Sequence, residues 1–84
     1  MKKIKNTAEL RRAIAEGHHD FRVWLDGCLI SRKTITPAAR GRFKIVNHID
    51  ESVQRLTARQ LRTHSIIGDA MRAGAFMVEE TGQD

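Results

Sequence analysis

The sequence predicts an α+β fold, in which helices cover one face of an antiparallel β-meander of three to four strands. Three observations predict it. A β-hairpin signal lies in the first half, capping boxes begin helices before and after the strands, and 84 residues with 40% hydrophobic and 30% charged side chains are typical of a small globular chain. We therefore expect one domain over residues 1–78, followed by a frayed tail over residues 79–84.

The first element is an N-terminal helix that begins at Asn6 or Thr7. Glu9 lies three residues after Asn6, as in a capping box, and Gly17 is suited to end the helix at its C′ position. The helix has a narrow apolar stripe of Leu10, Ala13 and Ile14.

The hairpin is centred on Asp26-Gly27, the pair favoured in a two-residue type I′ turn because both positions need a positive φ. This turn places Trp24 opposite Leu29 and Phe21 opposite Arg32. The core face then carries Phe21, Val23, Leu25, Cys28 and Ile30, and the opposite face carries Arg22, Trp24, Leu29, Ser31 and Lys33.

The second hairpin strand is expected to reach Thr34 or Ile35. Strict alternation places Ile35 on the opposite face from Ile30, so either the strand ends early or a β-bulge lies near residues 31–33.

A loop over residues 36–41 follows, because it holds the only proline and ends in Gly41. Residues 42–47 form a third strand, with Phe43 and Ile45 facing inward and Arg42, Lys44 and Val46 facing outward. Residues 53–56 are predicted as a fourth strand at the sheet edge.

Two short helices complete the domain. Thr57 and Gln60 form a capping box that begins a helix over about residues 57–63. A second helix begins at Thr63 or Ser65 and ends before Gly74. It directs Ile66, Ile67, Ala70 and Met71 into the core, and residues 75–78 are a possible final strand.

Residues 55–76, RLTARQLRTHSIIGDAMRAGAF, together with SRKTI at residues 31–35, resemble a group of small uncharacterised bacterial proteins of similar length. In that group a Leu-Thr-capped helix is likewise followed by a helix with the pattern Ile-Gly-x-Ala-Ile/Met-x-x-Gly-Ala. The resemblance covers about residues 8–78 and implies a shared α+β fold. It implies no activity, ligand or functional residue.

Positive charge is concentrated in the first half of the chain. Up to His48 there are eleven Lys and Arg against four acids, a net +7, whereas the remainder carries −2, which gives the whole chain +5. Such a distribution favours an anionic partner, or it keeps a small protein soluble. The predicted outer sheet face holds the candidate binding residues Arg22, Trp24, Lys33, Arg42 and Lys44.

Other kinds of site find less support. The histidines and the single cysteine lack the spacing of metal ligands, so no metal or other cofactor is expected. A catalytic group of His19, Asp20 and Cys28 would need a convergence that the sequence does not indicate, and Cys28 is predicted to point into the core. The two C-terminal helices leave too short a turn for a helix-turn-helix. Arg55 precedes the first of these helices, and Arg59 and Arg62 share one of its faces; this row is interpreted as a solvated surface, with binding of a phosphate or an acidic partner as the alternative.

The sequence thus predicts a small bacterial binding or adaptor module that is not an enzyme. Its partner is another protein or a second copy of itself, and the alternative is nucleic acid bound by the same basic face, with Trp24 stacking on a base. No membrane contact is expected. A cytoplasmic location is predicted, because no export signal is visible and the single cysteine cannot form an internal disulfide.

Overall fold

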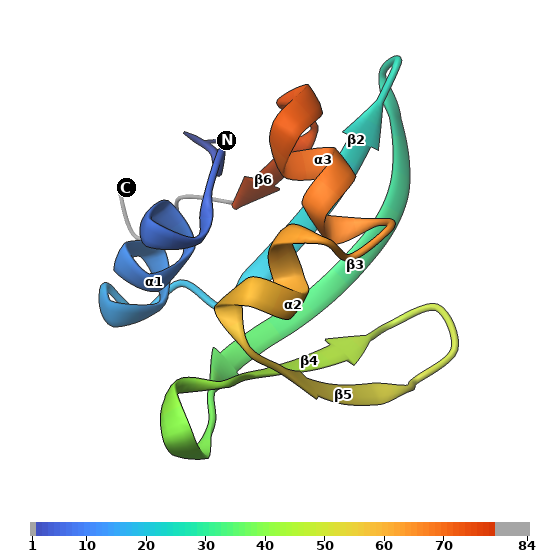
Figure 1. Cartoon of the computed structure of the whole chain (residues 1–84). Helices are drawn as coiled ribbons and strands as arrows, with labels where there is room; N and C mark the ends of the chain where they lie inside the picture. The colour runs from blue at the N-terminus through green and yellow to red at the C-terminus, as the bar shows by residue number, and fades with distance from the viewer. Residues whose placement is uncertain (1, 79–84) are drawn as a thin grey trace.

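Three helices lie on one face of a six-stranded antiparallel sheet in the computed structural model, which describes residues 2–78 (Figure 1). The α+β prediction is confirmed. The predicted tail over residues 79–84 lies outside the described residues. In chain order the elements are β1 (Lys2–Lys3), α1 (Thr7–Ala15), β2 (Asp20–Leu25), β3 (Cys28–Pro37), the 3-10 turn η1 (Ala39–Gly41), β4 (Phe43–Asn47), β5 (Val53–Leu56), α2 (Ala58–Arg62), α3 (Ile67–Ala73) and β6 (Phe76–Val78).

The sheet has the strand order β1-β6-β2-β3-β4-β5. The meander β2 to β5 is therefore confirmed, with β5 at one edge as predicted. The final strand β6 joins the sheet between β1 and β2 and pairs antiparallel with both. Strand β1 was not predicted, because two lysines carry no alternating apolar pattern.

The predicted helix caps are confirmed. Asn6 accepts a hydrogen bond from the Glu9 N–H at the start of α1. Thr57 and Gln60 form a reciprocal capping box at the start of α2. Gly74 ends α3 with a φ of 72°, in the left-handed region that glycine adopts without steric cost.

The α2–α3 packing depends on Gly68. A Cβ at this position would lie 2.5 Å from the Arg62 carbonyl oxygen and 2.8 Å from the Leu61 carbonyl oxygen. Only glycine lets α3 approach the end of α2 this closely.

The hairpin turn is confirmed, but the register beyond it is partly wrong. Asp26 and Gly27 both have a positive φ, and Trp24 pairs with Leu29 as predicted. The next pair is Val23 with Ser31, so Ile30 has no partner on β2 and forms a β-bulge. The bulge lies one residue before the predicted stretch and moves the rest of β3 by one position.

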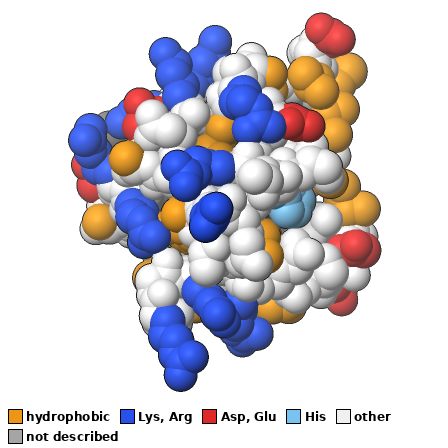
Figure 2. All heavy atoms as spheres, viewed as in Figure 1, with side chains coloured by type: hydrophobic (Ala, Val, Ile, Leu, Met, Phe, Trp, Pro, Cys, Tyr) orange, Lys and Arg blue, Asp and Glu red, His pale blue; other side chains and the backbone are white. Residues whose placement is uncertain are grey.

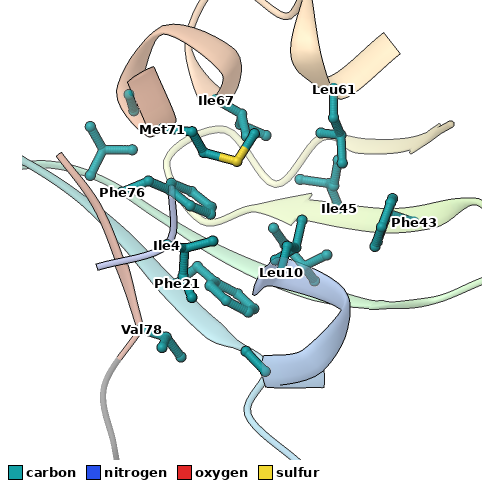
Figure 3. Packing of buried hydrophobic residues seen from close by; sticks show 14 of the residues in the cluster. Ile4, Leu10, Phe21, Phe43, Ile45, Leu61, Ile67, Met71, Phe76 and Val78 are labelled. Carbon is teal, nitrogen blue, oxygen red and sulfur yellow. The ribbon is translucent and has the colours of Figure 1, made fainter. Parts of the chain in front are cut away.

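A single cluster of buried hydrophobic side chains fills the space between the sheet and the helices (Figure 3). Phe21 on β2 and Phe76 on β6 stack with ring centroids 5.5 Å apart. The fully buried Leu10 of α1, Leu61 of α2 and Ile67 of α3 close the cluster from the helical side.

Four predicted core positions are wrong. Leu25, Cys28 and Ile30 are exposed because the hairpin tip projects past α3 (Figure 1), and a cavity lies between Leu25, Ile30 and the small side chains of α3. Ile66 is exposed because it stands at the N-cap of α3, before the helix turns its apolar side to the sheet.

Candidate functional site

The sheet face opposite the helices carries three of the five predicted binding residues. Arg22 and Trp24 alternate with the buried Phe21 and Val23 on β2, and Lys44 follows the buried Phe43 on β4. We call this surface the outer face. These charged and aromatic side chains come from β2 and β4, the two strands that flank β3 in the sheet.

Lys33 does not belong to the outer face, and the prediction for this residue is wrong. Because of the bulge at Ile30, Lys33 pairs with Phe21 on the core side of the sheet and is only 3% exposed. Burial lowers the pKa of its amine, whereas the Asp50 carboxylate opposes the shift. Lys33 therefore acts within the fold and cannot contact a partner on the outer face.

Arg32 takes the outer position that was assigned to Lys33. It pairs directly with Arg22, and both guanidinium groups approach the Asp20 carboxylate, at 3.4 Å from Arg32 and 3.6 Å from Arg22. Arg55, which the sequence grouped with Arg59 and Arg62, instead lies on β5 and pairs with Lys44 of β4. The sequence signal for Arg32 was the position of Ile35, which required either a bulge or an early end of the strand and did not locate the bulge.

Arg42 also departs from its predicted place. It precedes β4, is exposed, and lines a groove on the helical side of the molecule with residues of α1. The loop predicted over residues 36–41 is shorter, because β3 continues to Pro37. The 3-10 turn that follows directs the chain toward α1 before β4 begins.

Trp24 is half-buried beside Leu29 instead of standing free in solvent. Its indole nitrogen is buried and has no hydrogen-bond partner within residues 2–78. The ring therefore packs against the sheet, as expected for a cross-strand pair with an apolar neighbour.

Exposed hydrophobic side chains gather at the hairpin end of the molecule. Within the described residues six large hydrophobic side chains are exposed, and five of them lie here, between 44% and 68% exposed. We call these five the hairpin-end patch: Leu25, Leu29, Ile30, Ile49 and Ile66. In Figure 2, hydrophobic side chains lie along the right-hand edge of the molecule, whereas Lys and Arg spread over the helices.

Two cavities connect the members of this patch. One, of about 290 Å³, is lined by Leu25, Ile30 and Ile66 together with small residues of α3. The other, of about 380 Å³, lies where β4 has ended beside β3 and is lined by Leu29, Ile30 and Ile49. Ile30 lines both cavities, so the bulge residue joins the two halves of the patch.

The histidines do not converge. His48 Nε2 lies 2.6 Å from the Thr34 hydroxyl, and His19 Nδ1 lies 3.2 Å from the Ile35 carbonyl oxygen. Over residues 2–78 no three His, Cys, Asp or Glu side chains come together as metal ligands would. Cys28, far from the core, cannot join His19 and Asp20, which lie at the other end of β2 and β3.

His64 has a structural role that the sequence did not indicate. Its Nδ1 accepts hydrogen bonds from the N–H groups of Ile66 and Ile67, both at 3.1 Å, and so caps the start of α3. Burial, and secondarily the positive charge of Lys33, lower the pKa of the imidazole. The neutral ring required for this cap is therefore favoured.

Arg59 and Arg62 are exposed on α2, as predicted for a solvated helix face. Across the described residues, no helix is both long and apolar enough to span a bilayer.

Comparisons with protein-family models, with curated proteins and with solved structures found no match to this chain. The resemblance to small bacterial proteins therefore stays a prediction.

Proposed function

We propose that this protein is a non-catalytic binding module that docks a partner protein through the hairpin-end patch and the adjoining arginines of the outer face. The observation that carries the proposal is the gathering of five exposed hydrophobic side chains around the β2–β3 tip. Contiguous exposed apolar patches on small proteins mark contact sites, whereas single exposed hydrophobic residues are ordinary.

The surroundings of the patch support the same function. Trp24 and Leu29 form a pair on the outer face, and Arg22 and Arg32 lie beside them along the same two strands. Tryptophan and arginine are enriched among the residues that dominate binding energy, and an apolar centre with a charged border is the usual composition of an interface.

The charge of the protein favours a partner with acidic groups around an apolar centre. The chain carries +5, and within residues 2–78 both Arg22 and Arg32 of the outer face approach the Asp20 carboxylate. Two copies that each carry +5 repel each other. A second copy is therefore a candidate partner only through the apolar residues at the tip.

The test compares two sets of substitutions in one binding experiment. Tagged wild-type protein and a Leu29→Gln/Ile30→Gln variant are used to enrich proteins from an extract of the source cells, with Arg59→Gln on α2 as the matched control. We expect specific proteins that are enriched by the wild type and by Arg59→Gln but lost with the double variant. Equal enrichment by all three proteins would contradict the proposal.

Sedimentation from 10 to 500 µM distinguishes the second copy from another protein. Concentration-dependent dimerisation that the double variant abolishes identifies self-association through the patch. A strict monomer assigns the patch to a different protein.

A second candidate is single-stranded nucleic acid bound along the outer face. The observation in its favour is the position of Trp24 near Arg22 and Arg32, with Lys44 and Arg55 farther along the sheet. Anisotropy of a labelled oligonucleotide at 50 and 200 mM salt tests it. A steep loss of affinity with salt, by about one unit of log-log slope per phosphate contacted, would support this candidate.

We infer a reducing compartment, such as the cytoplasm, as the place of action. Cys28 is an exposed free thiol beside the hydrophobic patch, and a reducing environment keeps such a thiol from intermolecular oxidation.

A further inference from the structure

A groove on the helical side of the molecule, at the opposite end of β3 from the hairpin tip, combines an apolar lining with two arginines. It runs between α1 and the connection from β3 to β4 and has a volume of about 250 Å³. Its apolar lining comes from Ile14, Ala15, Pro37, Ala38 and Phe43. Arg11 and Arg42 line the same groove.

Arg11 is held in place by two contacts. Its Nη2 donates a hydrogen bond to the Gly41 carbonyl oxygen at 3.1 Å, and its guanidinium carbon lies 4.6 Å from the centre of the Phe43 ring. A guanidinium has five N–H donors, and the Gly41 bond uses one of them. The remaining donors are therefore presented on a side chain that has already lost much of its conformational freedom.

The connection between β3 and β4 brings the second arginine to the groove. Arg40 adopts a φ of 61° and Gly41 a φ of 69°, and this left-handed pair turns the chain so that Arg42 and the Gly41 carbonyl reach the groove that α1 borders. A positive φ is uncommon for arginine and strains the backbone modestly. The local fold thus maintains a conformation that the Arg40 side chain itself does not favour.

Neither guanidinium is neutralised by the described part of the protein. No carboxylate of residues 2–78 lies within ion-pair distance of Arg11 or Arg42. Two positive charges that line one small groove repel each other, and an anion between them would remove that repulsion. Arginine is also the side chain best suited to bind carboxylate and phosphate with two parallel hydrogen bonds.

We propose that this groove binds a small amphipathic anion, in which one carboxylate or phosphate group is attached to a flat apolar body. The anionic group contacts Arg11 and Arg42, and the body lies against Pro37 and Ala38. The groove volume of about 250 Å³ is enough for one ring with its anionic group. This site is independent of the proposed protein-docking surface.

The experiment is a titration of the full chain followed by amide chemical shifts, with phenyl phosphate and benzoate as probes. We expect saturable shifts at the amides of Ala15, Ala38 and Gly41, with a Kd on the order of 1 mM for so small a ligand. The stronger of the two probes identifies phosphate or carboxylate as the preferred head group.

Two further probes separate the parts of the ligand. Inorganic phosphate supplies the charge without the apolar body, and benzyl alcohol supplies the ring without the charge. Both should bind about tenfold more weakly than phenyl phosphate or not at all. Inorganic phosphate binding as tightly as phenyl phosphate would overturn the amphipathic ligand.

Substitutions locate the site. Arg11→Gln and Arg42→Gln should each weaken binding at least about tenfold, because each removes a charged hydrogen-bond donor. Arg12→Gln is the matched control, since Arg12 is exposed on the same helix and does not line the groove. If Arg11→Gln impairs folding because the Arg11–Phe43 contact is lost, Arg42→Gln still tests whether the groove binds the anion. An absence of saturable shifts up to 10 mM, or equal weakening by Arg12→Gln, would refute the site.

Discussion

The two halves of β3 share a strand and the same neighbour, β2, yet they perform different tasks. Up to and including the bulge residue Ile30, the residues Cys28, Leu29 and Ile30 are exposed at the hairpin tip. After it, Ser31, Lys33 and Ile35 alternate into the core, and β4 pairs with the strand from Lys33 onward. One unpaired residue separates a half that presents hydrophobic side chains to solvent from a half that is part of the fold.

The comparison shows that side-chain type alone does not decide which residues form a surface. An isoleucine, Ile30, is exposed, whereas a lysine, Lys33, is buried three positions later on the same strand. The determining features are the bulge, which resets the alternation, and the helices, which end before the hairpin tip.

The largest expected effect is on the free energy of unfolding, which a substitution in the buried half of β3 should lower much more than one in the exposed half. Ile35→Ala removes a fully buried side chain next to β4 and should cost about 2–5 kcal/mol. Ile30→Ala removes a side chain that is already 48% exposed and should cost less than about 1 kcal/mol. Urea unfolding of the two variants measures both values. Equal losses of unfolding free energy in the two variants would contradict the difference in burial between the two halves of β3.

A smaller effect is expected for the pH dependence of stability. It depends on His64, which lies close enough to Lys33 in the buried half of β3 to be affected by its charge. Because the folded-state pKa of His64 is lowered, the unfolded chain binds more protons between that pKa and 6.5. Stability should therefore be complete above pH 6.5 and decrease as the pH falls through this interval, because protonation removes the acceptor for two N–H groups.

Replacing His64 isolates this effect. His64→Ala should cost about 1–2 kcal/mol at pH 7.5, as the loss of a helix cap does, and the acid-dependent decrease should become shallower. His48→Ala is the comparison variant, since His48 is exposed and caps no helix. Thermal unfolding from pH 5 to 8 gives both slopes, and parallel slopes for His64→Ala and wild type would exclude His64 as the titrating group.

The smallest effect is expected for Lys33→Met, within about 1 kcal/mol of wild type or slightly stabilising at pH 7. The substitution replaces a desolvated amine by an apolar side chain of similar length. Burial lowers the folded-state pKa of Lys33 below 10.5, so wild-type stability should increase with pH between that pKa and 10.5. Chemical denaturation at pH 7 and pH 10 should show this increase in the wild type and less of it in the variant; a strongly destabilised variant would contradict the assignment.

Much of the fold could be predicted because its signals are local. The Asp26-Gly27 turn and the caps at Asn6 and Thr57 each depend on residues a few positions apart, and all three are confirmed. The outer-face residues could be predicted only in part, because the bulge position depends on where the helices and β4 end. A one-residue error in that position exchanged Lys33 for Arg32.

The hairpin-end patch could not be predicted for a related reason. The alternation in residues 21–30 is that of a half-buried hairpin, and nothing in the sequence states that α3 stops short of the tip. The groove beside α1 likewise joins Arg11 to residues 37–43, a contact that only the folded chain creates.

The most direct test of the central claim is to map binding onto the two halves of β3 by NMR. The ¹⁵N-labelled protein is titrated with extract of the source cells, and line broadening is followed at each amide. We expect broadening at Trp24, Leu29, Ile30 and Ile49, with Ile35 and the α2 amides unchanged apart from slower tumbling. Broadening centred on Lys44 and Arg55, with the hairpin tip unaffected, would contradict the claim that the exposed half of β3 is the contact surface.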